Sequence, residues 1–292
     1  MRPLPCLVLL GCTTAGPSGP VTPPAADSGA TDANVPADTW VPPPSCSDVI
    51  PCENGLACCS GFCADTSRDW KNCGACGVAC TEAQYCDGKA CLDATFANVC
   101  HAPKATVVLD GIAADDEPGM VLGAALVGCG LAVQYVPTWM ATGVLADDGR
   151  PMTGPGNMLV TVGGSYTQPS VAYMEASLSP IFTRSAFAGQ NLQVVVRATQ
   201  ATLLDIAVSS LSPAHDYFVL QIAYEPSSAS LCLIDYGFYA PGTKAAAWYT
   251  ATNVLPHRGA YTDRWYVYEW QDTDVSGDPS IGDVFAKKAS GK

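Results

Sequence analysis

Basic side chains are scarce in this chain. Only 14 of its 292 residues are Lys or Arg, against 27 Asp or Glu, and the formal net charge is −13. Neutralising phosphate groups requires a surplus of positive charge, so we expect no nucleic acid as a partner and no electrostatic attraction to an anionic membrane surface. Charged residues of both signs make up only 14% of the chain and hydrophobic residues 48%, which argues against wholesale disorder and for a sizeable core.

Several diagnostic patterns are also missing. There is no Gly-X-Y period, which excludes collagen, and no apolar run reaches the roughly 18 to 20 residues that a spanning helix needs. No G-x-G-x-x-G or Walker pattern is completed, so we expect no nucleotide or organic cofactor.

The N-terminal residues indicate export. Arg2 supplies a positive charge, residues 4–10 form a short apolar run, and Leu9-Leu10-Gly11-Cys12 follows. This order resembles the bacterial lipobox, which implies a signal peptide over residues 1–11 and a diacylglycerol on Cys12. The alternative is an ordinary secretion signal with an incidental cysteine. We therefore predict an exported protein, anchored at the outer membrane or cell surface by acyl chains alone.

Residues 12–45 are expected to form a disordered tether behind the lipidated cysteine. Eight prolines and no Lys or Arg lie between residues 13 and 45. Such a composition buries too little apolar surface to offset the entropy of ordering, and interleaved prolines favour an extended, semi-rigid chain.

Cysteines define the next segment. Ten of the 15 cysteines in the chain lie in a stretch poor in aliphatic residues, at Cys46, Cys52, Cys58, Cys59, Cys63, Cys73, Cys76, Cys80, Cys86 and Cys91. In an exported chain this density predicts about five disulfides in place of a hydrophobic core, with the connectivity left open. Zinc is the alternative, because Cys73-Gly-Ala-Cys76 has ligand spacing, but no histidine and no second such pair completes a set.

The run from Cys63 to Cys80 carries a family resemblance. Its Asp65-Thr66, Asp69, Asn72-Cys73-Gly74 and Cys76-Gly77 positions resemble the Stig1-type (stigma-specific) cysteine-rich module found in myxobacterial surface lipoproteins. The resemblance implies an extracellular binding or spacer module over residues 46–99 that carries out no catalysis. A purely mechanical stalk is the other interpretation.

Residues 100–292 have the pattern of an α/β domain. Apolar runs predict strands over 105–110, 131–136, 158–162, 193–197, 216–224, 231–236 and 265–270. Helices are expected over 118–127, 169–178 and 243–255, the last with Thr243 as N-cap. This alternation predicts a mostly parallel sheet with one antiparallel hairpin, turned at residues 226–228. Whether Cys100 joins the cysteine-rich module, and whether Cys129 pairs with Cys232, stays open.

Two stretches of this domain, residues 157–164 and 216–274, are similar in pattern to the C-terminal α/β region of archaeal S-layer proteins. The similarity implies a cell-envelope or surface role without chemistry. The chain departs from that family at Ser165-Tyr166, directly after the glycine pair at 163–164.

Catalytic motifs are weak. Gly163-Gly164-Ser165-Tyr166-Thr167 lacks the final glycine of a nucleophile elbow, and only His101, His215 and His257 are available as a base. The paired carboxylates Asp115-Asp116 and Asp147-Asp148 are interpreted as solvated turns. A pocket that joins Ser165 to a histidine would favour an enzyme, whereas scattered histidines would favour a binding protein.

One acidic loop has the spacing of a hard-cation site. Oxygen side chains stand at positions 1, 3, 5, 7, 9 and 12 of the loop, with a glycine at position 6, and we predict calcium on Asp272, Asp274, Ser276, Asp278, Ser280 and Asp283. Pro279 and a preceding strand depart from the usual motif. An acidic surface turn is the alternative.

Taken together, these features predict a surface lipoprotein with a non-catalytic binding, adhesion or envelope-structural role. The expected partners are extracellular polysaccharide or another surface protein. The aromatic residues 265–270 would suit sugar stacking, although core packing explains their alternation equally well. The alternative function is a hydrolase that acts on cell-wall or extracellular polymer.

Overall fold

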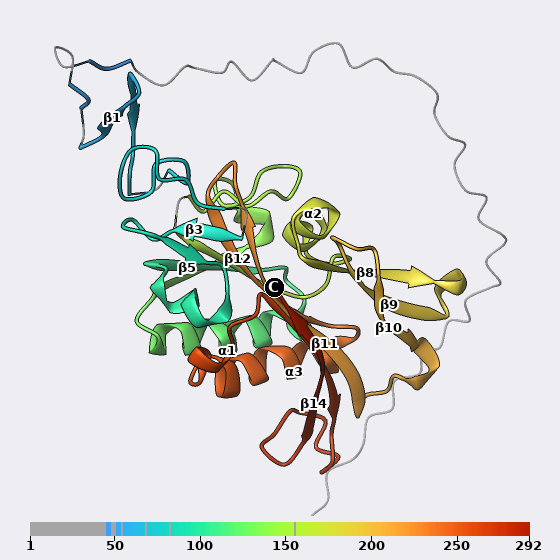
Figure 1. Cartoon of the computed structure of the whole chain (residues 1–292). Helices are drawn as coiled ribbons and strands as arrows, with labels where there is room; N and C mark the ends of the chain where they lie inside the picture. Colours follow the sequence, from blue (N-terminus) through green and yellow to red (C-terminus); the bar gives the residue numbers. More distant parts are fainter. Residues whose placement is uncertain (1–44, 48–50, 54, 68, 82, 155) are drawn as a thin grey trace, which may run out of the picture. The chain divides into compact units, whose positions relative to one another are not determined.

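A computed structural model describes residues 45–47, 51–53, 55–67, 69–81, 83–154 and 156–292 (Figure 1). The predicted signal peptide, the lipidation site Cys12 and almost all of the tether lie outside these residues. Among the described residues, no helix has both the length and the apolar character needed to cross a membrane.

The cysteine-rich region contains little regular structure. Two short antiparallel hairpins pair β1 (Ala57–Cys59) with β2 (Phe62–Ala64) and β3 (Gln84–Cys86) with β4 (Cys91–Asp93). Five disulfides connect the region: Cys46–Cys58, Cys52–Cys63, Cys59–Cys76, Cys73–Cys86 and Cys80–Cys91. The expected disulfide-rich, loop-dominated region is confirmed.

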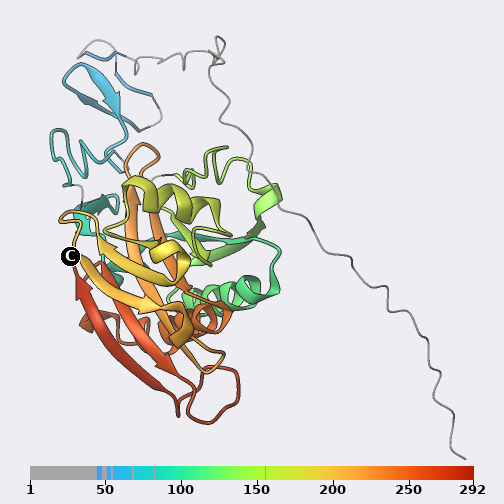
Figure 2. The ribbon, with the colours of Figure 1, turned by 90° about the vertical axis from the view of Figure 1, so that its right-hand side faces the viewer.

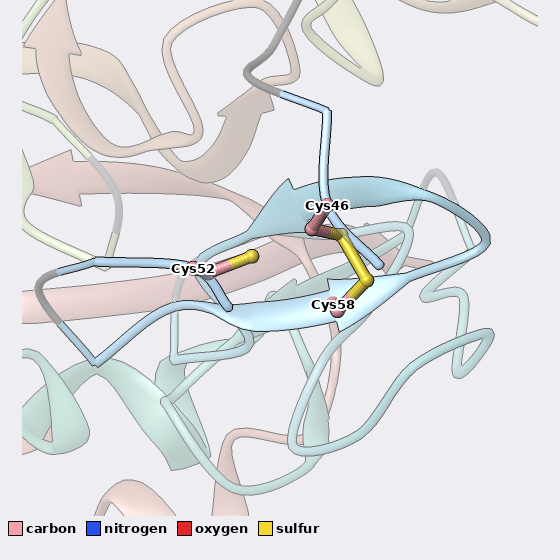
Figure 3. A group of neighbouring side chains, drawn as sticks. All are labelled: Cys46, Cys52 and Cys58. Carbon is pink, nitrogen blue, oxygen red and sulfur yellow. A yellow bond between two sulfur atoms is a disulfide. The ribbon is translucent and has the colours of Figure 1, made fainter. Parts of the chain in front are cut away.

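This connectivity leaves no thiolate for zinc. Cys73 and Cys76, which have ligand spacing, are bonded to Cys86 and Cys59 instead of facing one ion. Figure 3 shows a second close group, in which Cys46 and Cys58 share a disulfide and the sulfur of Cys52 lies nearby. Because a zinc ligand must be a free thiolate, neither group can hold the ion while these bonds exist.

The C-terminal region is built on a seven-stranded mixed sheet, which confirms the α/β class. The strands are β5 (Lys104–Leu109), β6 (Ala132–Pro137), β7 (Met158–Val162), β11 (His215–Glu225), β12 (Ser230–Gly237), β13 (Trp265–Gln271) and β14 (Val284–Gly291). Their order is β14-β13-β11-β12-β7-β5-β6. Pairings from β12 to β6 are parallel and those from β14 to β12 are antiparallel, including the expected β11–β12 hairpin.

Two different layers cover the two faces of this sheet (Figures 1 and 2). On one face lie α1 (Ala113–Gly128) and α3 (Ala240–Tyr249), with a π-helical turn at Thr250–Val254. On the other lie α2 (Pro169–Ser177) and a three-stranded antiparallel sheet of β8 (Ile181–Ala186), β9 (Asn191–Val196) and β10 (Thr202–Ala207). Because both faces are covered, the central strands β5 and β7 are apolar along nearly their whole length.

Short 3₁₀ turns complete the described elements. They lie at Phe96–His101, Thr138–Met140, Phe187–Gly189, Val208–Ser210 and Arg258–Ala260. Phe96 and Val99, which precede the expected boundary at residue 100, pack in the same core as α1 and α3. The residues just before position 100 therefore contribute to the folding of the α/β domain.

The structure corrects one local prediction, adds three strands and decides one open alternative. Helix α1 begins at Ala113, ahead of Pro118, so Asp115 and Asp116 lie in its first turn and Asp115 is buried instead of solvated. Strands β8, β10 and β14 were not predicted. The aromatic strand β13 is packed in the two cores rather than offered to sugar, with Trp270 fully buried.

The cap of α3 was also assigned wrongly. Tyr239 is the N-cap and Thr243 lies inside the helix, where its hydroxyl donates to the Tyr239 carbonyl at 3.3 Å. The buried carboxylate of Asp216, from β11, accepts from the backbone N–H groups of Tyr239 at 2.9 Å and Gly242 at 3.0 Å. A residue distant in sequence therefore satisfies the amides that a local cap would otherwise serve.

The remaining cysteines resolve the open pairing. Cys100 bonds to Cys129, the C-cap of α1, and Cys232 is a free, buried thiol in β12. Burial raises the pKa of Cys232 far above its usual value, which disfavours the nucleophilic thiolate form.

Candidate functional site

The acidic loop between β13 and β14 brings part of the predicted calcium set together. One carboxylate oxygen from each of Asp272, Asp274 and Asp283 lies within 4.8 Å of the other two. Asp272 is buried, Asp283 is half-buried and Asp274 is exposed. Three hard oxygen donors at this separation could supply part of the coordination of a metal ion.

Hydrogen bonds hold these carboxylates in place. Asp272 accepts from the backbone of Gly277 at 2.7 Å, and Asp274 accepts from the backbone of Ser276 at 2.9 Å. Asp283 accepts from the Trp270 indole at 3.0 Å and from the backbone of Ser280 at 2.8 Å. Hydrogen bonds from Ser276 are the main reason that the pKa of Asp274 lies below its usual range. The loop is therefore ordered by its own acidic side chains.

The other three predicted ligands are arranged differently. Ser280 donates its hydroxyl to Asp274 at 3.2 Å, so it borders the three carboxylates. Ser276 donates its hydroxyl to the Asp278 carbonyl at 2.8 Å. The Asp278 carboxylate pairs with Lys244 of α3 at 2.8 Å. An ion at the three-aspartate cluster would therefore not use the Asp278 carboxylate in this arrangement.

A second candidate site is a cavity of about 410 Å³ beyond the carboxyl ends of β7 and β12. It is lined by the loop after β7, by β8 and β9 and by the end of β12, through Gly164, Ser165, Tyr166, Thr183, Arg184, Ser185, Leu192, Tyr236, Gly237 and Phe238. Crevices at the carboxyl ends of strands are the usual ligand sites of open α/β sheets.

A buried carboxylate ties several of these lining residues together. Glu175 of α2 accepts hydrogen bonds from the hydroxyls of Tyr236 and Thr183, the latter at 3.3 Å. The Ser165 side chain lies near enough to favour the ionised form of this carboxyl. Burial raises the pKa of Glu175 to about 7, although these hydrogen bonds favour the ionised form and oppose the shift. One carboxylate thus fixes side chains from β8 and β12.

The three histidines lie outside the described lining of this cavity. His215 lies against Glu269 at 2.8 Å and the Ser210 carbonyl at 2.8 Å, and His257 lies against the Asn253 carbonyl at 2.9 Å. Burial lowers the pKa of His215, but its hydrogen bonds to Glu269 and Ser210 outweigh this and leave the pKa raised. Ser165 therefore lies beside an acid, and no histidine is among the described residues that line the cavity.

A third polar group lies at the carboxyl end of β5. Burial, followed by the neighbouring Asp110, raises the pKa of Asp115 to about 7, while a hydrogen bond from Thr167 at 3.0 Å opposes the shift. Gly163 has φ of +110°, and a Cβ there would lie 2.4 Å from the Asp115 carboxylate. This contact explains why glycine is needed where β7 ends.

Sequence reasoning missed the second site almost entirely. Glu175 falls within a predicted helix, Tyr236 ends a predicted strand, and Thr183 and Arg184 lie in the unpredicted strand β8. The one available signal was the glycine pair before Ser165 at a strand end.

A scan against models of known protein families and a search of curated proteins found no match to this chain.

Proposed function

We propose that this protein is an exported surface lipoprotein, anchored through Cys12, with a non-catalytic binding or envelope-structural role. Its support is the disulfide-rich region, in which five disulfides join ten cysteines within a short stretch. Such bonds form and persist in oxidising compartments outside the cytosol. The Stig1-like and S-layer-like patterns agree with this surface role, and the candidate partners are extracellular polysaccharide or another surface protein.

Anchoring is tested by fractionating cells that express the full chain. We expect the wild-type protein in the membrane fraction and Cys12→Ser in the soluble exported fraction, because lipidation requires the thiol. Cys6→Ser, which changes a cysteine within the signal, is the matched control and should stay with the membrane. Equal distribution of the wild type and Cys12→Ser would contradict the lipid anchor.

We further propose that calcium binds the loop at Asp272, Asp274 and Asp283. The convergence of their carboxylates within 4.8 Å supports this, and so does the millimolar affinity range that suffices for extracellular calcium modules. Ion binding at this position would stabilise the loop between β13 and the edge strand β14.

Calorimetry on the exported chain carrying Cys12→Ser tests the calcium site. We expect saturable heat at roughly 0.1 to 1 mM calcium. An Asp272→Ala/Asp283→Ala double variant should lose this heat. An Asp147→Ala/Asp205→Ala double variant, which removes the same charge from exposed positions elsewhere, should keep it. The absence of heat in the wild type would leave the loop as an acidic turn.

A hydrolase is the second candidate because Ser165 lies beside Glu175, a carboxylate whose pKa of about 7 suits a general base. Hydrolysis of p-nitrophenyl acetate, measured beside Ser165→Ala, separates the two functions. The binding role predicts equal, background rates for both proteins. A rate at least 100-fold lower in the variant would establish catalysis and overturn the non-catalytic proposal.

A further inference from the structure

The outward side of α1 is almost entirely apolar. This helix lies on the outside of the seven-stranded sheet (Figure 1), and its exposed residues are Ala113, Glu117, Met120, Val121, Ala124, Val127 and Gly128. Glu117 is the one charged residue among them, and the helix carries no charge from Pro118 to its end. A surface helix normally has polar residues on the side turned away from the core, so this side has the composition of a buried one.

Two aromatic side chains extend this apolar surface to the edge of the sheet. Tyr135 of β6 lies against α1, because a Cβ on Gly123 would be 2.5 Å from its hydroxyl, and that hydroxyl donates to the Met120 carbonyl at 3.4 Å. Trp139, just after β6, lies over the turn that precedes α1, since a Cβ on Gly111 would be 2.9 Å from its ring. The outward side of α1, the edge of β6 and Trp139 are called the α1–β6 face below.

Strand β6 is an unprotected edge. It pairs with β5 alone, and its outer edge has no strand partner among the described residues. Proteins usually protect such edges with charged side chains or bulges. The opposite edge strand, β14, has both, because it contains Lys287 and Lys288 and its pairing with β13 shifts in register. β6 contains no charged residue and pairs with β5 without a shift, so its edge is suited to pairing with a further strand.

The size of the α1–β6 face fits an interface between two proteins. Its large apolar side chains are between 42% and 71% exposed, at Met120, Val121, Val127, Tyr135, Trp139 and Met140. Six such groups offer on the order of 600 Å² of surface, near the roughly 800 Å² that each partner contributes to a standard interface.

We propose that a second copy of this chain covers the α1–β6 face. A two-fold axis perpendicular to the sheet would pair β6 with β6 of the second copy in antiparallel orientation and would place the two α1 helices side by side. One partner would then satisfy both the free strand edge and the apolar helix surface. This association goes beyond the proposed surface role and does not depend on it.

The charge distribution favours this occupant. The chain has a net charge of −13, yet the exposed residues of the α1–β6 face are uncharged apart from Glu117 at one end. Two copies would therefore meet without ionic repulsion at the contact, whereas a basic partner would be attracted to the acidic remainder of the surface.

Sedimentation velocity on the exported chain carrying Cys12→Ser tests the proposal. We expect an equilibrium between monomer and dimer with a Kd on the order of 10 μM or below, as found for interfaces of this size. Added salt should not weaken the association, because the contact is apolar and salt screens the repulsion between the two acidic chains. A chain that stays monomeric up to about 100 μM would overturn the proposal.

Variants locate the contact. Met120→Lys/Val127→Lys should raise the Kd at least tenfold, because the two-fold axis brings like charges together in an apolar contact. Phe187→Lys/Ile281→Lys adds the same charge at exposed apolar positions outside the α1–β6 face and should keep the wild-type Kd. Since all four side chains are exposed, both variants should keep the wild-type melting temperature, which serves as the check on folding.

Hydrogen exchange at low and high protein concentration identifies the strand edge. The amides of β6 should exchange more slowly at the high concentration, and those of β14 should exchange equally at both. A dimer that protects β14 instead of β6, or one with the wild-type Kd in Met120→Lys/Val127→Lys, would overturn the proposal. Membrane fractionation and the calcium titration do not involve this face, so failure here is distinguishable from failure of the proposed function.

Discussion

The cysteine-rich region and the α/β domain are held together by different forces. Among the described residues of the range 46–91, a cluster of buried side chains outside the domain core consists of Cys73, Cys80 and Cys86, with Trp70 and Cys91 against it. The α/β domain instead buries two extensive clusters, one on each face of its sheet, and has one disulfide. Short loops closed by covalent bonds thus replace the apolar burial that a small region cannot supply.

The difference shows what each region demands of its sequence. The cysteine-rich region needs cysteines at fixed positions and glycines where the backbone must turn, while most other side chains are exposed. The domain needs apolar residues at alternate positions of its strands and tolerates variation at its surface. Changes that affect one region more than the other test this comparison.

Reduction should produce the largest contrast. Each disulfide of residues 46–91 closes a loop of 11 to 17 residues, which corresponds to roughly 3 kcal/mol of stabilisation. A phosphine reductant should therefore abolish amide protection over β1 to β4 and leave β7 and β11 protected in hydrogen exchange. Repeating the experiment in Cys100→Ala/Cys129→Ala removes the contribution of the domain disulfide. Retained protection in β1 to β4 would show a non-covalent core in that region.

Replacing a large side chain by alanine should instead destabilise the α/β domain more than the cysteine-rich region. Leu122 of α1 is completely buried, so Leu122→Ala should lower the free energy of unfolding of the domain by about 2 to 5 kcal/mol. Phe62→Ala, in the cysteine-rich region, removes a larger side chain that is half-exposed and should cost less than about 1 kcal/mol. Urea denaturation measures both, and equal costs would contradict the comparison.

A buried acid makes domain stability depend on pH. Asp235 is fully buried in β12, and burial raises its pKa to about 8, above the unfolded value near 4. The folded state therefore binds more protons than the unfolded state between these values, so stability falls as pH rises from about 4 to 8. Asp235→Asn should increase the free energy of unfolding by on the order of 2 kcal/mol at pH 8 and change it little at pH 4. Thermal unfolding at the two pH values tests this. An equal gain in the stability of the variant at both would contradict it.

Glycine substitutions should give the smallest effects and differ in sign. Gly74, in the cysteine-rich region, has φ of +74°, and a Cβ would lie 2.1 Å from the Lys89 carbonyl oxygen, so Gly74→Ala should cost about 1 to 3 kcal/mol. Gly128, the last residue of α1, has open space around its Cβ position, and Gly128→Ala should stabilise by about 0.5 kcal/mol. Hydrogen exchange reports each region separately, and a stabilising Gly74→Ala would contradict the assigned strain.

Local sequence patterns predicted many of the strands and helices of the fold. Strand β7 was predicted with its observed bounds, because a short, fully apolar run ended by Gly163-Gly164 has few other interpretations. Strands β8, β10 and β14 were missed because each is partly exposed and mixes polar with apolar residues. The start of α1 was misplaced because Pro118, taken as a first-turn residue, is accommodated inside the helix.

The two candidate sites also differ in whether local sequence patterns could predict them. The loop at 272–283 was found in the sequence because its donors are neighbours along the chain. The cavity beyond β7 and β12 was not found, since its residues come from four segments that pack together only in the folded domain.

The sequence by itself determined the disulfide-rich character of one region, the α/β class of the other and the positions of most strands along the chain, because spacing and periodicity are local properties. Only the tertiary structure decided the pairing of the cysteines, the choice of Asp216 over Thr243 to serve the start of α3, and the gathering of hydroxyl groups around Glu175. Each of these depends on contacts between residues far apart in the chain, and such contacts are selected by the packing of the whole domain.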